Sequence, residues 1–394
     1  MSGSCGFHQG VDTTSIQQKA DQCVKCGLCL PHCPTYRLFR DEAESPRGRI
    51  ALLQGVASGQ LQPDSRLLGH LDNCLLCRRC EDACPSGVEY GAMLDDARTE
   101  LTAGRHGRLL DLLTSNRLLD MALALGRGVG RLLPQSDGII LAKLLALVPQ
   151  HRPFSLKTRL YPALSEPRGH VRLFAGCIGR HTDAPALQSL VALLTRQGFS
   201  VSVPPDQACC GAMHAHAGER ARALAFVESN RKAFGGKSDA ILVTSSGCGL
   251  QLQESLESPV FEATAFVAEH CDLPQLPADS FRHTAFYIPC SLYAMQQAGS
   301  LRNLFTAIGG GAIQELSGLG CCGGAGMHLL THPDMAKKLA EPLVGKVREL
   351  GINTLLTTNS GCSLHLARSL SDAGLSVTVM HPLEWLYQQL EAHP

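Results

Sequence analysis

The sequence predicts a multidomain protein of mixed α+β and α/β class, with a small helical N-terminal domain followed by two related α/β cysteine-rich modules. Three observations predict this order. Two runs of four cysteines near the N-terminus have the same spacing. A longer pattern of four cysteines occurs twice in the C-terminal part. Around those cysteines, short β-rich runs alternate with helical stretches, which is typical of α/β units with a small, mostly parallel sheet.

The composition favours an intracellular metalloprotein. The chain has 394 residues, 44% of them hydrophobic, and its 35 Lys and Arg residues balance 35 Asp and Glu residues. This balance gives no general attraction to nucleic acid or anionic lipid. The 18 cysteines fall in tight groups, and no signal peptide is visible before them. We therefore expect a reducing compartment in which thiols are kept for metal.

The first repeat is the four-cysteine run, present as CVKCGLCLPHCP and as CLLCRRCEDACP with a displacement of 51 residues. The spacing C-x2-C-x2-C-x3-C-P is that of bacterial ferredoxins, in which the fourth cysteine of each run ligates the other of two clusters. We therefore predict two [4Fe–4S] clusters with crossed ligands. Cluster 1 takes Cys23, Cys26, Cys29 and Cys84, and cluster 2 takes Cys74, Cys77, Cys80 and Cys33.

Details around these runs support a cluster domain. A structural zinc site would use two separated C-x2-C pairs instead of four closely spaced cysteines. A tight turn at Gly27 is expected to let the first three cysteines converge. Ser45 is expected to cap a helix whose first turn contains Pro46. Four arginines are candidates to lie near the clusters and raise their potentials. They are Arg47, Arg49, Arg78 and Arg79.

The second repeat relates the two modules, with offsets of 112 to 114 residues. Adjacent cysteines in a strand point to opposite faces, so both can reach one centre only from an irregular loop. Flanking glycines supply that backbone freedom. Each module thus offers four thiols at the ends of three β-runs, the edge where α/β sheets bind ligands. The two candidate sets are Cys177, Cys209, Cys210 and Cys248, and Cys290, Cys321, Cys322 and Cys362.

These repeats divide the chain into four segments. They are a dicluster domain over residues 1–105, a helical connector over 106–168, a first module over 169–273 and a second module over 274–394. The apolar stretch 118–148 is interrupted by charged residues and a proline. We therefore expect two amphipathic helices there and no transmembrane span. An apolar face for a partner or a membrane surface is the alternative.

The remaining candidates are histidines and two single cysteines. Five histidines follow the module cysteines, namely His214, His216, His328, His332 and His365. We expect ordinary helix-start or buried histidines, with a ligand or proton-relay role as the alternative. Cys5 and Cys271 belong to no repeat and are expected to be free thiols. No Ser–His–Asp arrangement, phosphate loop or carboxylate pair indicates a catalytic or substrate site in this chain.

The modules carry a first family resemblance. The motifs ACCG at 208–211 and GCCG at 320–323 resemble the cysteine-rich domain of heterodisulfide reductase B-type subunits. That domain's full pattern ends in C-x-x-C and can hold a noncubane [4Fe–4S] cluster. Ser245 and Asn359 stand where the first cysteine of that pair would be. Because each module keeps four of five thiols, three interpretations stay open, namely a cluster, a zinc or other metal ion, and a structural thiol set.

The second resemblance covers nearly the full chain. From CVKCGLCLPHCPTY through PRGRI, HLDNCLLCRRCEDACPSGVEYG and both modules, the chain resembles the iron–sulfur subunits of bacterial glycolate oxidase. The resemblance implies an electron-transfer subunit of a flavin-linked 2-hydroxyacid dehydrogenase, an oxidoreductase acting on CH–OH donors. FAD-binding dehydrogenase subunits would be its partners and a quinone or membrane acceptor would receive the electrons. The implied location is cytoplasmic or peripheral on the inner membrane.

Other functions stay open beside glycolate oxidation. D-lactate is the nearest rival substrate for the complex. A heterodisulfide-reductase-like enzyme would use the modules for disulfide or quinone chemistry, although each module lacks the fifth cysteine. A membrane-docking subunit akin to that of anaerobic glycerol-3-phosphate dehydrogenase is the third alternative.

Overall fold

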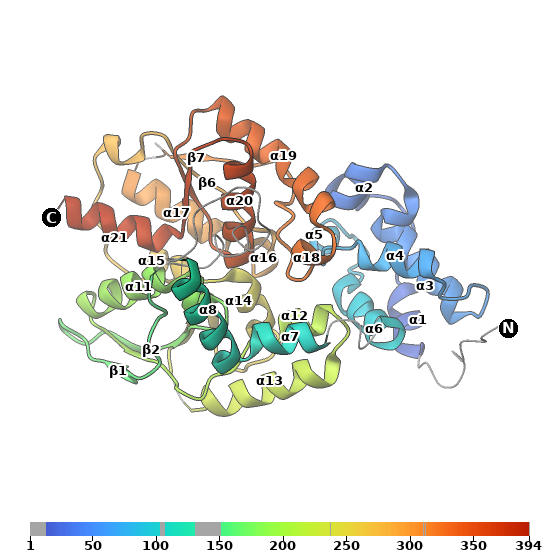
Figure 1. Cartoon of the computed structure of the whole chain (residues 1–394), viewed down its shortest axis with the longest axis horizontal. Helices are drawn as coiled ribbons and strands as arrows, with labels where there is room; N and C mark the ends of the chain where they lie inside the picture. Colours follow the sequence, from blue (N-terminus) through green and yellow to red (C-terminus); the bar gives the residue numbers. More distant parts are fainter. Residues whose placement is uncertain are drawn as a thin grey trace. The chain divides into compact units, whose positions relative to one another are not determined.

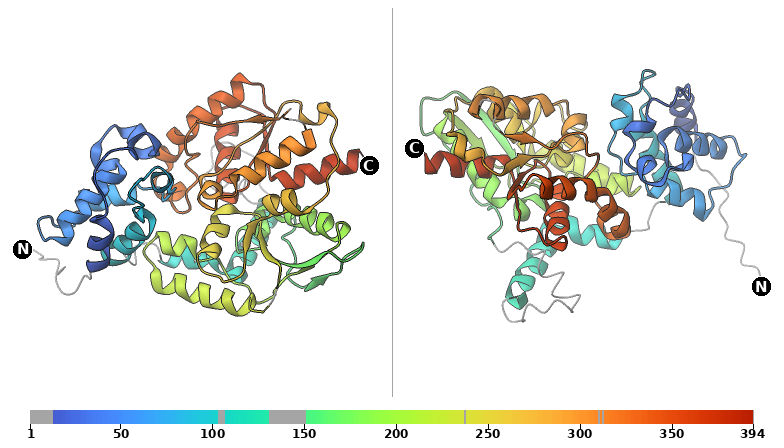
Figure 2. Two further views of the ribbon diagram at one scale, coloured as in Figure 1. Left: turned by 180° about the vertical axis from the view of Figure 1, so that it is seen from behind. Right: turned by 90° about the horizontal axis from the view of Figure 1, so that it is seen from above.

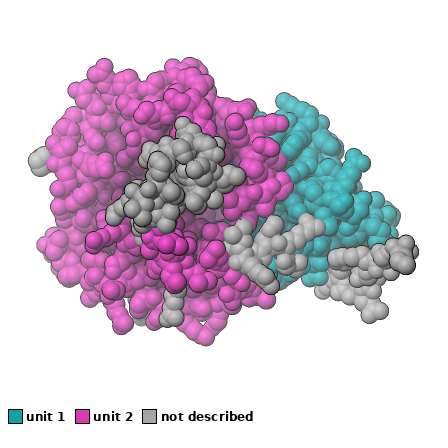
Figure 3. All heavy atoms as spheres, viewed as in Figure 1, with its two compact units in different colours: residues 1–107, 213–220 teal, residues 108–212, 221–394 magenta. Residues whose placement is uncertain are grey.

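The computed structural model describes residues 13–102, 107–130, 151–236, 238–309, 311 and 313–393. Contacts divide the chain into two compact units, which Figure 3 colours separately. Unit 1 comprises residues 1–107 and 213–220, and unit 2 comprises residues 108–212 and 221–394. The short segment 213–220 follows the first Cys-Cys-Gly motif in the sequence, yet its contacts are with the N-terminal unit.

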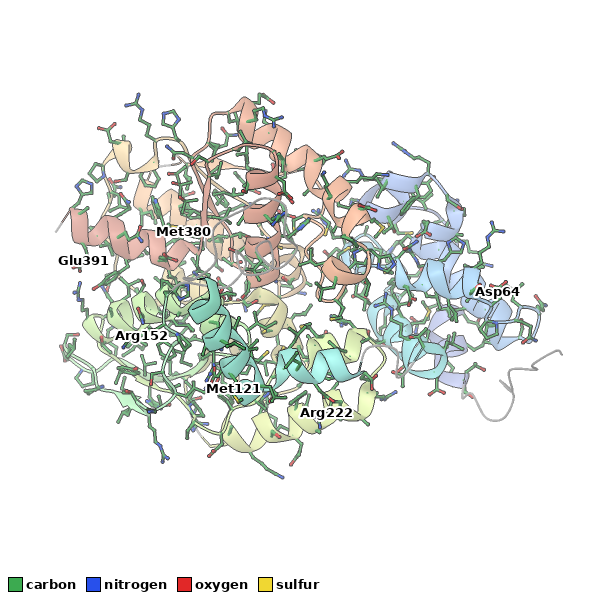
Figure 4. All side chains as sticks on the ribbon, in the orientation of Figure 1. Asp64, Met121, Arg152, Arg222, Met380 and Glu391 are labelled. Carbon is green, nitrogen blue, oxygen red and sulfur yellow. The ribbon has the colours of Figure 1, made fainter. Side chains whose placement is uncertain are left out.

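Unit 1 is built from short helices around the two cysteine runs (Figure 1). Its elements are α1 (Thr14–Ala20), η1 (Leu30–His32), α2 (Pro34–Phe39), η2 (Glu42–Glu44), α3 (Pro46–Ala57), α4 (Ser65–Asp72), α5 (Arg79–Asp82) and α6 (Tyr90–Thr102). The predicted cap of α3 is confirmed, because Ser45 Oγ accepts a hydrogen bond of 2.9 Å from the Gly48 amide. Asp64, labelled in Figure 4, caps α4 in the same way.

A small apolar core holds unit 1 together. Ile16 of α1, Leu53 of α3, Leu71 of α4 and Met93 of α6 are all essentially removed from solvent and belong to one cluster. Partly buried cysteines of both runs pack against the same cluster. The apolar side chains that stabilise the unit therefore also support the two cysteine loops.

Unit 2 contains two sheets, which confirms the predicted α/β class of the modules. The first contains β1 (Leu160–Tyr161), β2 (Gly169–Phe174), β3 (Phe199–Ser202), β4 (Ala240–Val243) and β5 (Val260–Glu262) in the order β1-β3-β2-β4-β5. The second contains β6 (Thr284–Phe286), β7 (Gln314–Glu315), β8 (Thr354–Leu356) and β9 (Thr378–Met380) in the order β7-β6-β8-β9. Among the described strands, only the β1–β3 pairing is antiparallel.

The helices of the two modules follow the strands of both sheets in the same order, and Figures 1 and 2 show them from three sides. Those of the first module are α10 (Gly179–Thr182), α11 (Ala184–Arg196), α12 (Ala212–His216), α13 (Arg220–Ala233), α14 (Ser246–Gln253) and α15 (Ala263–His270). Those of the second are η3 (Ala278–Phe281), α16 (Cys290–Ala294), α17 (Ala298–Gly309), α18 (His328–Thr331), α19 (Pro333–Glu349), α20 (Ser360–Asp372) and α21 (Pro382–Ala392).

The connector forms helices α7 (Gly107–Thr114) and α8 (Asn116–Gly130). Of the apolar stretch predicted to form two helices, residues 118–130 lie in α8, and residues 131–148 lie outside the described residues. Arg222 of α13, labelled in Figure 4, places its Nε 3.0 Å from Asp111 Oδ1 of α7. Among the described helices, none combines the length and hydrophobicity needed to span a bilayer.

The two modules share one hydrophobic core. Helix α11 packs on α21, and α15 packs on α17. These two contacts are equivalent under the internal repeat, because α11 corresponds to α17 and α15 to α21. Buried Leu187 and Phe266 of the first module belong to the same cluster as Phe305 and Trp385 of the second. The modules are therefore halves of one folded unit.

Candidate iron–sulfur site

Both cysteine loops of unit 1 adopt the same unusual backbone. Lys25 and Gly27 have φ angles of 56° and 85°, and the equivalent Leu76 and Arg78 have φ angles of 49° and 56°. Left-handed backbone is comfortable for glycine but costly for leucine, lysine or arginine. The turn expected at Gly27 is present, and the second run makes it with an arginine. The loop conformation is therefore imposed by its surroundings in the fold.

A cavity in unit 1 is lined by the four thiols predicted for cluster 1. Cys23, Cys26, Cys29 and Cys84 all line it, and Cys80 reaches it as well. Its empty space is about 430 Å³, open solvent at its mouth included. Cys26 is exposed, whereas the other three predicted ligands are half-buried. Four thiols around one cavity are a donor set that suits an iron–sulfur cluster.

The four cysteines predicted for cluster 2 also lie near one another. Cys80 lies within range of the charges of Cys77, Cys74 and Cys33. Cys33 and Cys80 are buried, and the other two are half-buried. Two hydroxyl groups contact this set, because Thr35 Oγ1 lies 3.2 Å from Cys33 Sγ and Tyr90 Oη donates to Cys74 Sγ at 3.6 Å.

Burial favours the protonated form of one thiol in each set. It raises the pKa of Cys29, although two backbone amides act in the opposite direction, and it raises the pKa of Cys80. Because iron binds thiolate and not thiol, cluster assembly must release these protons. The residues present fit a cluster, and loading them becomes easier as the pH rises.

Arg49 is the arginine that lies deepest in unit 1. It donates hydrogen bonds to Glu44 Oε2 at 2.5 Å, to the Glu44 carbonyl at 2.5 Å and to the His70 carbonyl at 2.6 Å. It also donates to Thr35 Oγ1 at 3.1 Å, the hydroxyl that contacts Cys33. Arg47 differs, since it pairs with the exposed Glu42 and donates to the Lys25 carbonyl in the first loop.

Arg98 was not predicted from the sequence, yet it holds the start of the second cysteine loop. Its Nη2 donates to the carbonyls of Leu71 and Cys74, each at 2.8 Å. Its Nη1 donates to the His216 carbonyl at 2.9 Å, which joins the segment 213–220 to α6. An arginine in the middle of an amphipathic helix carries no sequence signal for this role.

In the modules, both thiol sets lie at the carboxyl ends of three neighbouring parallel strands, as predicted. Cys177 follows β2, the pair at 209–210 follows β3, and Cys248 lies in the helix after β4. The second set follows β6, β7 and β8 in the same way. The Sγ atoms of Cys177 and Cys209 are 3.5 Å apart, and those of Cys322 and Cys362 are 2.9 Å apart.

Six of the eight module thiols are buried. A hydrogen bond with Cys209, together with burial, raises the pKa of Cys177. Tyr287 lies beside the second set. Burial and the charges of the neighbouring cysteines raise the pKa of Tyr287, and its hydroxyl donates to the Gly320 carbonyl at 2.9 Å. Across the described residues, no group of three or more His, Cys, Asp or Glu side chains is arranged to hold a single metal ion.

The positions that lack a fifth cysteine instead join the two modules. The Ser360 amide donates to Ser245 Oγ at 3.4 Å, and Asn359 Nδ2 donates to Ser246 Oγ at 3.5 Å. Ser291 Oγ in turn lies 2.7 Å from Ser246 Oγ.

Next to these contacts, Asp183 accepts hydrogen bonds from Ser360 Oγ at 2.7 Å and from Thr244 Oγ1 at 3.1 Å. We call this polar contact between the modules the seam.

Four of the five histidines flagged in the sequence occupy helix ends or buried positions, whereas His365 lies inside α20 and is half-buried. His216 Nδ1 lies 3.3 Å from Asp95 Oδ1, and His365 Nε2 lies 2.9 Å from the Ala336 carbonyl. His328 is buried and stacks on His332 with ring centroids 4.5 Å apart. His214 is also buried. Cys271 is half-buried, and burial raises its pKa to about 12, whereas Cys5 lies outside the described residues.

Two family models match the chain. The 4Fe-4S dicluster domain matches residues 19–88, and the cysteine-rich domain matches residues 171–253 and again 284–367. The chain is 31% identical to the glycolate oxidase iron-sulfur subunit of Escherichia coli over 94% of each chain. It is 29% identical to the probable glycolate oxidase iron-sulfur subunit of Bacillus subtilis over 90% of each chain. Lactate utilization protein A of Shouchella clausii is 20% identical over 54% of this chain and 96% of that protein.

Proposed function

Because this chain belongs to the family of glycolate oxidase iron–sulfur subunits, we propose that it is the electron-transfer subunit of a flavin-linked glycolate dehydrogenase complex. In this role it relays electrons from an FAD-binding subunit toward a quinone at the inner membrane. Oxidation of glycolate to glyoxylate takes place on the flavin subunit. The observation that carries the proposal is the gathering of eight cysteines into two sets within unit 1.

For the ligands we propose Cys23, Cys26, Cys29 and Cys84 around cluster 1, and Cys74, Cys77, Cys80 and Cys33 around cluster 2. The cavity that contains Cys84 together with three cysteines of the first run supports the crossed assignment. Bound [4Fe–4S] clusters would supply one-electron redox centres at these positions. The chain's own contribution is to hold the loops, through Arg49 and Arg98, and to bury the thiols of the second set.

Glycolate is favoured over D-lactate as the substrate of the complex. The match to the glycolate oxidase subunit covers 94% of this chain at 31% identity, whereas the match to the lactate utilization protein covers 54% at 20% identity. The substrate would bind the flavin subunit and not this chain. D-lactate oxidation is therefore kept as the second candidate for the complex. Both substrates assign the same electron-transfer role to the present chain.

We also propose the two module thiol sets as a further site for a cluster or a metal ion. Their convergence at the carboxyl edge of each sheet supports this proposal. The alternative is a buried thiol set that only stabilises the modules. Iron content separates these cases.

Recovery of the native complex tests the function. We expect an affinity-tagged full chain to bring down a flavin-bearing subunit, and the complex to reduce a quinone analogue with glycolate. The isolated chain should show two low-potential cubane signals by electron paramagnetic resonance (EPR) and no oxidation of hydroxyacids. Turnover of glycolate by the isolated chain, or recovery of no flavoprotein, would overturn the proposal.

A further inference from the structure

The loop of the first cysteine run exposes apolar side chains next to the most accessible of the predicted ligands. Val24 is 69% exposed and Leu28 is 56% exposed. Cys26 lies between them and is itself exposed. Single exposed apolar residues are common on protein surfaces, but these two flank one predicted cluster ligand. We call residues 24–28 the first loop.

The second cysteine run provides an internal comparison. Leu75 and Leu76 occupy the positions equivalent to Val24 and Lys25, and each is only 7% exposed. Leu76 also belongs to the hydrophobic core of unit 1. Both loops share the same left-handed backbone. The difference in exposure therefore comes from whether other residues cover the loop, and not from its backbone. Within the described part of the chain, the first loop is the one left accessible.

The charge around the first loop indicates the kind of partner that fits it. Lys25, Arg37 and Arg40 are exposed, and none forms an ion pair with a described residue. Glu42, the acidic side chain that Arg47 links to the first loop, is paired with that arginine. Over residues 51–102, in contrast, acidic residues outnumber basic ones by eight to four. A partner that presents acidic side chains around an apolar patch would complement the first loop and its surroundings.

We propose that the first loop is the docking surface for the flavin-bearing subunit, whose matching face is apolar with an acidic rim. This inference rests on the proposed function. Electron transfer slows steeply with distance, so a redox partner must lie against the ligand loop of an exposed centre. Redox encounters use small interfaces, which one loop and its surroundings can provide. The loop lacks the aromatic anchors and the cluster of four or more cations typical of lipid-binding segments.

Binding measurements on the full chain with reconstituted clusters test this surface. The probe is the purified flavin-bearing subunit recovered with the chain. We expect Val24→Glu and Lys25→Glu each to weaken its affinity about five- to thirtyfold, the range of one or two interface contacts. The matched controls are Leu164→Glu, at a site 72% exposed in unit 2, and Arg66→Glu, at an exposed cation of unit 1. Neither control should change the affinity.

Two further measurements keep the test independent of cluster assembly. EPR signals of both clusters show whether each variant is loaded. If the first two variants lose a cluster, Leu28→Glu and the salt dependence of the wild-type affinity decide instead, since an acidic-to-basic contact weakens as ionic strength rises. Affinity that responds neither to salt nor to Leu28→Glu overturns the docking surface.

The outcomes separate this inference from the proposed function. Unchanged affinity in loaded Val24→Glu and Lys25→Glu chains overturns the docking surface and leaves the electron-transfer role standing. The loop is assigned to a membrane if the wild-type chain binds vesicles of anionic phospholipid and these variants do not, while their affinity for the flavin subunit is unchanged. That result also overturns the docking surface. Recovery of no flavin-bearing subunit overturns the proposed function first and the docking partner with it.

Discussion

Arg49 and Glu44 form an ion pair in which both side chains are removed from solvent. The distance from Arg49 Nη2 to Glu44 Oε2 is 2.5 Å, and the exposed fractions of the two side chains are 0% and 5%. Glu44 also lies 2.7 Å from His70 Nδ1 and accepts a hydrogen bond of 2.8 Å from Asn73 Nδ2. The pair therefore ties the start of α3 to the end of α4, where the second cysteine run begins.

Arg49→Met should destabilise unit 1. The substitution leaves the Glu44 carboxylate buried without its cation, and breaking a buried pair in this way costs ~3–5 kcal/mol. We expect a lower urea midpoint for unfolding of the loaded chain, with earlier bleaching of the cluster absorbance. The matched control is Arg47→Met in the same helix turn, which removes an exposed pair and should shift the midpoint little. Equal midpoints for the two variants would contradict the role assigned to Arg49.

Cys84→Ser should damage the cluster built mainly by the first run, and Cys33→Ser the cluster built mainly by the second. The reason is the crossed arrangement, in which Cys84 shares a cavity with three cysteines of the first run. We expect Cys84→Ser to lose the same EPR signal as Cys26→Ser, and Cys33→Ser the same signal as Cys77→Ser. Cys271→Ser is the control and should keep both signals. If Cys84→Ser instead lost the signal that Cys77→Ser loses, and Cys33→Ser the signal that Cys26→Ser loses, the ligand assignment would be overturned.

Iron content should distinguish the interpretations of the module thiols. Two cubane clusters bring about eight iron atoms per chain, and clusters in one or both modules would raise this to about twelve or sixteen. We expect that any iron above eight disappears from a chain carrying Cys209→Ser and Cys322→Ser, while the two dicluster signals persist. A count near eight that the double variant leaves unchanged would argue against module clusters, and bound zinc measured in the same sample would then identify a metal ion.

The stability of unit 2 should fall as the pH rises above about 6.5. Burial alone would lower the pKa of His381. The hydrogen bond and charge of Glu262, with the charge of Asp183, outweigh burial and raise this pKa above its usual 6.5. A raised pKa stabilises the native state below the unfolded pKa, and this contribution is lost as the pH rises through the native pKa. Burial raises the pKa of Asp183 as well, and that of Glu384, so these acids act in the same sense at lower pH.

Thermal midpoints between pH 6 and pH 8 test this dependence. His381→Gln should flatten the decline, because it removes the imidazole whose pKa Glu262 and Asp183 raise. His365→Gln is the control, since burial lowers the pKa of His365, and it should keep the decline. A wild-type midpoint that does not change over this range would show that His381 stays in one protonation state.

Much of this protein could be predicted from cysteine spacing and internal repetition. The run C-x2-C-x2-C-x3-C-P restricts what its loops can bind, because three thiols separated by two residues converge only around one centre. The module cysteines likewise predict strand ends, and the structure places Cys177 after β2 and Cys290 after β6. These features are local, so the order of residues alone determines them.

Tertiary structure decided what joins these local pieces. Arg98 reaches the His216 carbonyl across 118 positions of sequence, and Ser360 reaches Ser245 across 115. Such polar contacts have no periodicity, so no pattern in the chain predicts them. Tertiary structure also sets Arg78 in left-handed backbone, where its own preference would not place it, and it buries Leu75 while exposing Val24. The sequence determined which cysteines are candidate cluster ligands, and packing between distant segments decided which of the two loops is exposed.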